Sequence, residues 1–221
     1  MKTKILALAQ IKGGCGKTTI SAHLAGHLCK TNTVAVIDSD VPQLSLTNWF
    51  NSGPEKENLT LAQVSNAEEL LKAVDHFDGK VDYIVIDLAP RLADLTRAGI
   101  AVSDLTVVPV NTDLVEIWAL KQTLVLMKEA KDKIPGFEYY VLANKFKETN
   151  SNHIEMRNAI PVQFKDYDCR LLDHSLGLRS TFPTAIGAGI TSEEVKPRNK
   201  KAVDEMTALL DEIKIKLERT K

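Results

Sequence analysis

The chain has 221 residues, of which 44% are hydrophobic and 26% charged, and its formal net charge is −1. Such a chain can form one folded domain and is not a polycation, so any affinity for nucleic acid must come from a local basic patch. Its three scattered cysteines exclude a disulfide framework, and no apolar run approaches the roughly 20 residues of a membrane-spanning helix. We therefore expect a reduced, cytoplasmic protein without a signal peptide.

Short apolar runs recur along the chain, with helical stretches between them. Strands are predicted over 5–9, 33–38, 59–64, 82–87, 105–110 and 137–143, with a seventh candidate at 169–172. Helices are predicted over 20–28, 66–76, 114–131 and 200–217. Nearly continuous apolar strands that alternate with helices favour a mainly parallel sheet covered on both faces. No repeat or linker interrupts the pattern, so we predict a single α/β domain over 1–221.

A glycine-rich loop follows the first predicted strand and opens the first predicted helix. It reads Lys12-Gly13-Gly14-Cys15-Gly16-Lys17-Thr18-Thr19. Glycines let successive backbone N–H groups point at an anion, and the N-terminus of the following helix adds partial positive charge. In such a loop Lys17 would reach the β- and γ-phosphates and the Thr18 hydroxyl would hold Mg²⁺. The loop departs from the general phosphate-loop pattern at Ile11, where that pattern has a glycine.

Three carboxylates end two of the predicted strands. Asp38 and Asp40 follow the second strand, and Asp87 ends the fourth. Ligands of parallel sheets bind outside the carboxyl ends of the strands, so these acids are expected near the glycine loop. Phosphoryl transfer to water needs a metal at the phosphates and a group that positions the water. We expect Asp87 and Asp38 to support the metal and Asp40 to activate the water.

These stretches resemble a known family. The glycine loop is similar to the deviant Walker A motif of the ParA/MinD ATPases, and Asp38-Ser39-Asp40-Val41-Pro42-Gln43 resembles the switch I segment of ParA-type partition ATPases. Residues 44–49 look especially like the small plasmid ParA proteins of the ParF type. The resemblance implies a single-domain P-loop NTPase fold. In the family the acid usually precedes the proline directly, so Val41 lengthens this segment by up to about 3.5 Å of chain.

The resemblance also implies ligands and residue roles. ATP and Mg²⁺ are the implied cofactors, and two subunits would enclose two ATP molecules. Lys12 would reach the partner's phosphates, in the manner of an arginine finger. Asp40 would activate the hydrolytic water, with Lys17 as a further catalytic residue. The loop residues Gly13, Gly14, Cys15, Gly16, Lys17, Thr18 and Thr19 would bind the nucleotide, and Thr18, Asp38 and Asp87 would form the metal site. Asn144 either contacts adenine, as in relatives, or is a turn former at a strand end.

Two branches of this family bind different surfaces, the MinD branch a membrane and the ParA branch DNA. The last predicted helix has one apolar stripe and a mixed-charge face, whereas membrane-surface helices have a basic face, so we expect no membrane contact. The partition branch binds DNA without sequence preference. Here the candidate DNA-binding residues are Arg179, Arg198, Lys200 and Lys201. A basic run is also typical of a plain solvated face. We expect no N-terminal helix-turn-helix domain, and hence no operator binding.

The resulting hypothesis is a partition ATPase that dimerises on ATP. It would bind DNA in the ATP form, associate with the nucleoid, and be released by slow hydrolysis that a ParB-like or small centromere-binding partner stimulates. A first alternative is a related ATPase that positions a protein microcompartment or a chemoreceptor cluster. A second is a P-loop small-molecule kinase or ligase, which would require a second substrate pocket.

Overall fold

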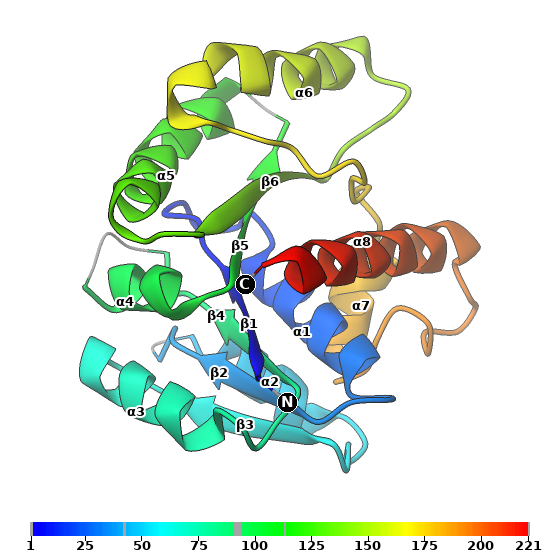
Figure 1. The fold of residues 1–221 in the computed structure, drawn as a ribbon. Coiled ribbons are helices and arrows are strands. Elements are labelled where there is room, and N and C mark those ends of the chain that lie inside the picture. Colours follow the sequence, from blue (N-terminus) through cyan, green and yellow to red (C-terminus); the bar gives the residue numbers. More distant parts are fainter. Residues whose placement is uncertain (1, 42, 91–93, 113, 221) are drawn as a thin grey trace.

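The computed structural model describes residues 2–41, 43–90, 94–112 and 114–220, and Pro42 of the switch I motif lies outside them. The strands of this part are β1 (Lys4–Leu8), β2 (Val34–Asp38), β3 (Leu59–Gln63), β4 (Tyr83–Asp87), β5 (Leu105–Asn111) and β6 (Glu138–Asn144). The helices are α1 (Lys17–Leu28), α2 (Ser45–Ser52), α3 (Ala67–Phe77), α4 (Asp94–Val102), α5 (Leu114–Lys133), α6 (Ser151–Gln163), α7 (Thr181–Gly187) and α8 (Lys200–Arg219), with a short 3₁₀ turn η1 (Lys165–Tyr167) (Figure 1).

The six strands of the described residues form one sheet in the order β3-β2-β4-β1-β5-β6. Every strand pair in it is parallel, which confirms the predicted α/β class. The register aligns Asp38 of β2 with Asp87 of β4 at the carboxyl edge. It also aligns Asn111 with Asn144 at the ends of β5 and β6. The sheet therefore brings polar residues from four strands to the edge at which the glycine loop leaves β1.

Helices cover both faces of the sheet, because side chains alternate between two hydrophobic cores. On one face α3, α4 and α5 pack against residues such as Ile37, Ile86 and Val108. On the other face α1, α2, α7 and α8 pack against residues such as Leu8, Val36 and Val107. The four inner strands β1, β2, β4 and β5 are buried on both sides, which explains their nearly continuous apolar sequences. Figure 1 shows the two helical layers on either side of the sheet.

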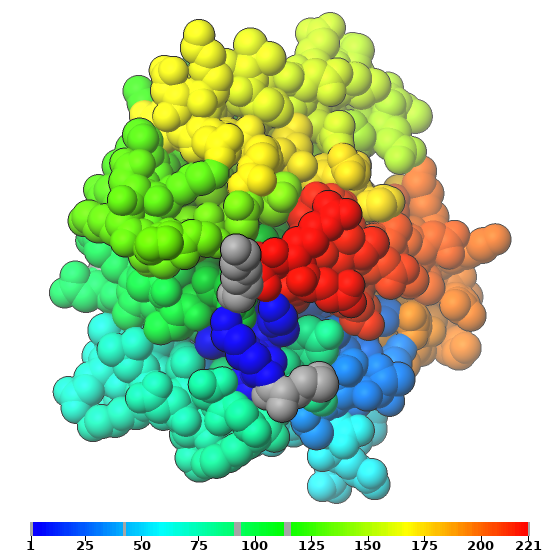
Figure 2. All heavy atoms as spheres, in the orientation of Figure 1, coloured from blue at the N-terminus to red at the C-terminus, as the bar shows by residue number. Residues whose placement is uncertain are grey.

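The apolar stripe of α8 packs on the sheet, as its spacing predicts. Ala202, Met206, Leu209 and Ile213 are all fully buried in the second core. Figure 2 shows α8 in red at the surface, beside the blue N-terminal residues and the yellow segment that follows α6. Within the described part of the chain, no helix combines the length and apolarity needed to cross a bilayer.

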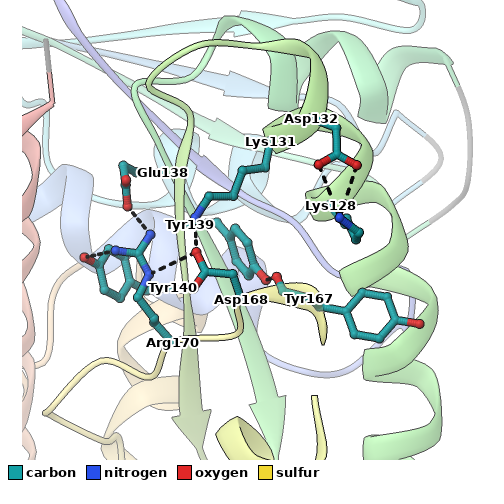
Figure 3. A network of polar contacts seen from close by, with 9 residues as sticks. All are labelled: Lys128, Lys131, Asp132, Glu138, Tyr139, Tyr140, Tyr167, Asp168 and Arg170. Carbon is teal, nitrogen blue, oxygen red and sulfur yellow. Dashed lines mark hydrogen bonds and ion pairs between the residues drawn. The ribbon is translucent and has the colours of Figure 1, made fainter. Parts of the chain in front are cut away.

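A polar network surrounds the amino end of β6, opposite the edge that carries the glycine loop. Arg170 contacts Glu138 and also lies over the ring of Tyr140, 4.7 Å from its centroid. Lys131 of α5 pairs with Asp168, which also lies 3.9 Å from Arg170 (Figure 3). These contacts fasten the segment after η1 to the edge of the sheet.

The sequence-based prediction of a strand at 169–172 is wrong. The segment makes only an isolated bridge, between Leu171 and Val141, and then runs past the end of β6 to a second bridge between Gly177 and Phe146. The patterns also missed α2, α4, α6 and α7. These helices are short or weakly amphipathic, and α6 contains Pro161, which normally argues against a helix interior.

Candidate nucleotide-binding site

The phosphate loop has the backbone conformation that its glycines predict. Gly14 and Gly16 have φ values of 79° and 96°, in the left-handed region that other residues rarely adopt. Asn144 of β6 braces the loop, because its Nδ2 donates a hydrogen bond to the Cys15 carbonyl over 2.7 Å. A Cβ at Gly16 would lie 2.3 Å from that nitrogen. Position 16 therefore favours glycine, because a residue with a side chain would be strained at this φ and would collide with Asn144 of β6.

Lys17, the first residue of α1, is buried with its ammonium group among loop carbonyls. Its Nζ donates to the Gln10 carbonyl over 3.0 Å and lies 3.5 Å from the Lys12 carbonyl. Lys17 also lines the cavity described below. A buried cation at the N-terminus of a helix suits a polyphosphate. Burial raises the pKa of the neighbouring Cys15 thiol, which favours the interpretation of this cysteine as a small packing residue.

The carboxylate of Asp87 lies directly beneath the first turn of α1. Thr18 Oγ1 donates to its Oδ2 over 2.6 Å, and Ser21 Oγ approaches its Oδ1 at 3.4 Å. Burial raises the pKa of Asp87 to about 7, and the nearby Asp38 contributes in the same direction. A hard divalent cation favours the ionised carboxylate, and Mg²⁺ commonly binds through one or two such groups together with substrate phosphates. Thr18 and Asp87 therefore fit a magnesium–phosphate site.

Asp38 and Asp40 have different surroundings, although they lie two residues apart. Both oxygens of the buried Asp38 accept backbone or hydroxyl hydrogen bonds, Oδ1 from Asp40 N–H and Oδ2 from the N–H and hydroxyl of Thr47 in α2. Asp40 is partly exposed and lines the cavity. Asp38 thus positions the switch I backbone, whereas the Asp40 side chain is accessible to a ligand. The extra Val41 is accommodated in a turn that Gln43 and Leu44 close onto the Asp40 carbonyl.

A cavity of about 630 Å³ opens above the phosphate loop. Its walls combine the loop, the acids and a segment just before and at the start of α7. The lining residues expected from sequence are Gly13, Gly14, Gly16, Lys17, Thr18, Thr19, Asp40, Asp87 and Asn144. Others were not anticipated there, namely Gln43, Leu88, Pro90, Lys145, Gly177, Leu178, Arg179, Ser180, Phe182 and Pro183. Leu178, Phe182 and Pro183 offer an apolar surface of the kind that accepts a flat heterocycle.

Lys12 occupies a different position from Lys17. It is not among the described residues that line the cavity, and its Nζ lies 2.6 Å from Glu116 Oε1 in α5. About a third of the Lys12 side chain is exposed, whereas Glu116 is largely buried. The ammonium of Lys12 is therefore held beside the phosphate loop, away from the cavity of its own chain.

The four candidate DNA-binding residues separate into two groups. Arg198, Lys200 and Lys201 are exposed at or just before the first turn of α8, and Lys201 pairs with Glu148 at 2.9 Å. Arg179 instead lines the cavity, and its guanidinium pairs with Glu205. No sequence motif signals this position of Arg179, because it depends on how α8 packs against the preceding segment.

Known proteins resemble this chain in sequence and in fold. A family model described as the CobQ/CobB/MinD/ParA nucleotide binding domain matches residues 6–216. The chain belongs to this family. The match extends from β1 into the last turns of α8, so the CobQ/CobB/MinD/ParA domain includes every element that lines the cavity. The predicted resemblance to the ParA/MinD family is thereby confirmed.

The individual relatives have different names, one referring to carboxysome distribution and another to chromosome partitioning. Maintenance of carboxysome distribution protein A of Halothiobacillus neapolitanus is 24% identical over 214 residues, which cover 96% of this chain and 97% of the relative. The chromosome-partitioning ATPase Soj of Thermus thermophilus is 26% identical over 159 residues, 59% of this chain and 64% of the relative. An ATP complex of a Cyanothece McdA variant superposes with a TM-score of 0.78 at 18% identity, over 99% of this chain and 98% of that one. At that identity the superposition shows a shared fold.

Proposed function

We propose that this protein is an ATPase of the ParA type that dimerises when it binds ATP with Mg²⁺, binds DNA without sequence preference, and releases it after slow hydrolysis. The observation that carries the proposal is the position of Lys12. A lysine that lies beside the phosphate loop but points to Glu116 rather than into its own cavity is available to a nucleotide held by a second copy.

The residues around the cavity supply the chemistry of hydrolysis. Lys17 and the loop amides bind the phosphates, Thr18 and Asp87 hold Mg²⁺ with Asp38 supporting the same edge, and Asn144 keeps the loop against β6. Asp40 positions the attacking water. When bound, Mg²⁺ neutralises charge on the β- and γ-oxygens. A lysine supplied by the partner would add positive charge at the transition state, an effect worth about 10³–10⁵ in rate for the arginine fingers of GTPases.

The DNA surface is assigned to Arg198, Lys200 and Lys201, which are exposed in one short stretch. A single copy presents little positive charge, since the chain as a whole carries a net charge of −1. Dimerisation would double the number of these cations on one particle and so make DNA affinity depend on ATP. A ParB-like or small centromere-binding protein is the proposed stimulating partner.

DNA retention compared without nucleotide, with ADP and with ATP tests the proposal. Retention is expected only with ATP, and the logarithm of the binding constant should fall with the logarithm of salt concentration by about 0.9 per neutralised phosphate. Replacing Lys200 and Lys201 by alanine should flatten that slope. Replacing Lys72 and Lys80, exposed on or near α3, is the charge-matched control. Equal retention in all three nucleotide states would refute the proposal.

A second candidate function is the positioning of a protein cargo instead of partition of DNA. It is favoured by the match to the carboxysome distribution protein, which covers almost the whole of both chains. Both functions use the same ATP-dependent dimer, so they differ in the partner that stimulates hydrolysis. Stimulation by a DNA-bound centromere complex favours partition, whereas stimulation by a cargo-associated protein without DNA favours positioning. The hydrolysis of ATP by a kinase or ligase would be stimulated by neither kind of partner. It would instead require a small-molecule acceptor.

A further inference from the structure

Two glutamates on one face of α8 hold the extended segment that runs from η1 to α7. Glu205 and Glu212 are seven residues apart, which places them two turns apart on the same side of the helix. Glu212 accepts hydrogen bonds from the backbone N–H groups of Asp173 and His174, at 2.8 and 3.0 Å. Glu205 accepts one from Gly177 N–H at 3.0 Å. Both glutamate side chains are mostly buried in these contacts.

The two glutamates differ in what they hold. Asp173 and His174 are not among the described residues that line the nucleotide cavity, whereas Gly177 and Arg179 are. Glu205 binds Arg179 as well as Gly177, with its Oε1 2.6 Å from Nη2 and its Oε2 3.3 Å from Nε. One carboxylate therefore fixes two residues of the cavity wall, and the Leu178 side chain between them is exposed at the cavity.

The close packing of this wall uses the space left by the glycine at position 177. A Cβ there would lie 2.7 Å from Arg179 Nε and Nη2, so the guanidinium folds back directly over the Gly177 backbone. This conformation brings Arg179 to Glu205, and the contact raises the pKa of the guanidinium, which keeps the ion pair charged. Glu205 thus contacts both Gly177 and Arg179, and the Arg179 side chain packs on Gly177.

The same helix carries the proposed DNA-binding lysines. Glu205 lies five residues after Lys200, about 7.5 Å along the helix at 1.5 Å per residue. Lys201 is in turn bound to Glu148 in the loop after β6, four residues beyond the Asn144 that braces the phosphate loop. The first turns of α8 are therefore attached to the cavity wall through Glu205, and to the loop after β6 through Lys201.

We propose that Glu205 is a positioning residue of the nucleotide site, which shapes the cavity wall through Gly177 and Arg179 and couples that wall to the basic first turn of α8. The effect on nucleotide binding stands on the contacts above. The coupling to DNA rests on the proposed function. Because a helix moves as a rigid body, a ligand that displaces the 177–179 wall would displace Lys200 and Lys201 with it.

The decisive comparison is between Glu205→Gln and Glu212→Gln. Both remove one buried charge from the same face of α8. Because Glu205→Gln removes the charge that holds two residues of the cavity wall, it is expected to weaken binding of a fluorescent ATP analogue about fivefold or more. Glu212→Gln is expected to lower the melting temperature as much as Glu205→Gln does, because it also removes a buried charge that accepts hydrogen bonds. It should nevertheless leave the Kd for the ATP analogue within about twofold of the wild-type value. An unchanged Kd in Glu205→Gln, or an equal loss of affinity in both variants, would show that Glu205 is only structural.

Arg179→Lys provides a second variant if Glu205→Gln folds poorly. It keeps the positive charge and leaves the Glu205 contact with Gly177 intact, but it removes the forked guanidinium. It should also raise the Kd for the ATP analogue, and a wild-type Kd would contradict a role for the pair. Exchange of Glu138 for Gln, which breaks the remote pair with Arg170 seen in Figure 3, is expected to leave the Kd unchanged.

The coupling is measured as DNA retention at saturating ATP divided by retention without nucleotide. This ratio should fall in Glu205→Gln and stay near the wild-type value in Glu212→Gln. A wild-type ratio in Glu205→Gln would overturn the coupling and leave the proposed function intact. If the wild-type protein itself shows no ATP-dependent retention, the proposed function and the coupling both fail, and the Kd comparison alone decides the role of Glu205 in the cavity wall.

Discussion

The ammonium of Lys12 lies 2.6 Å from Glu116 Oε1, while Lys17, five residues later, lines the nucleotide cavity. Two lysines of one loop are thus directed to different places. The second Glu116 oxygen is buried and has no partner in the described part of the chain, so this carboxylate depends on Lys12 for its neutralisation. Dimerisation that takes Lys12 to another subunit must break this ion pair.

We predict that Lys12→Ala abolishes ATP-dependent dimerisation and retains nucleotide binding. The proposed nucleotide contacts are made by Lys17 and Thr18 and do not involve the Lys12 side chain, so the Kd for ATP should change little. Sedimentation velocity with ATP is the measurement, and Lys72→Ala on α3 is the control. A dimer of wild-type stability in Lys12→Ala would exclude the trans role. Conversely, Glu116→Gln weakens the ion pair and should lower the ATP concentration at which half of the protein is dimeric.

Asp40→Ala is predicted to trap the ATP-bound dimer. The side chain lines the cavity, and its removal takes away the group proposed to position the attacking water while leaving Lys17, Thr18 and Asp87 in place. Phosphate release should fall by about 10² or more, a loss typical of general-base residues. The dimer should persist in sedimentation after wild-type protein has hydrolysed its ATP. Wild-type turnover in Asp40→Ala would remove this residue from the mechanism.

Affinity for Mg²⁺-ATP is predicted to increase with pH up to about pH 7 and then to level off. Asp87 has a pKa of about 7 in the folded chain, raised from 3.8 chiefly by burial. Magnesium binds its ionised form, so binding below pH 7 releases a proton and weakens by up to about tenfold per pH unit. Titration calorimetry in buffers of different ionisation enthalpy measures that proton. Asp87→Asn should abolish the proton release together with most of the magnesium dependence.

The raised pKa of Asp87 also affects the stability of the ligand-free chain. Because the folded state raises the pKa of Asp87, the stability gained from its proton is fully present below about pH 4 and is lost as the pH rises through about 7. His23 acts in the opposite sense, since burial lowers its pKa from 6.5 to about 4, so its contribution is fully present above about pH 6.5 and is lost as the pH falls through about 4. Nucleotide affinity is therefore a cleaner readout of Asp87 than thermal stability.

Gly16→Ala is predicted to disrupt the phosphate loop, and Gly13→Ala is the matched control for the stability of the fold. Position 16 has a φ of 96°, and a methyl group there would lie 2.3 Å from Asn144 Nδ2. A methyl group on Gly13 would meet no atom within 4 Å. Gly16→Ala should lower the free energy of unfolding by about 1–3 kcal/mol and weaken ATP binding by more than about tenfold. An unchanged unfolding midpoint would contradict the tight contact between the loop and β6.

The sequence was sufficient to place the centre of the site. Lys17 and Thr18 follow from the spacing of the loop, and Asp38 and Asp87 meet because the ends of parallel strands share one edge, as their observed pairing shows. Asn144 could be placed at that edge for the same reason, but its contact with the Cys15 carbonyl could not be predicted. Local patterns fix which residues end a strand, whereas a side-chain contact over 129 residues depends on the packing of the whole sheet.

The far wall of the cavity could not be predicted at all. Arg179 is one of the DNA-binding candidates predicted from the sequence, yet the structure turns it toward Glu205 and the nucleotide cavity. That segment was expected to begin with a strand at 169–172, but it forms single bridges and follows the surface of α8 instead. Its conformation is set by two glutamates of a helix that begins 23 residues after Gly177, which no local periodicity encodes.

The strand order has a consequence for the synthesis of this protein. β1 lies between β4 and β5, so the strand that carries the phosphate loop is made first but has no neighbour until more than 75 further residues have been translated. Asn144 closes the loop later still. Until then the nascent chain exposes the apolar strand Lys4–Leu8 and has no complete site for ATP. Nucleotide can therefore bind and stabilise this protein only late in translation, when most of the sheet has already formed.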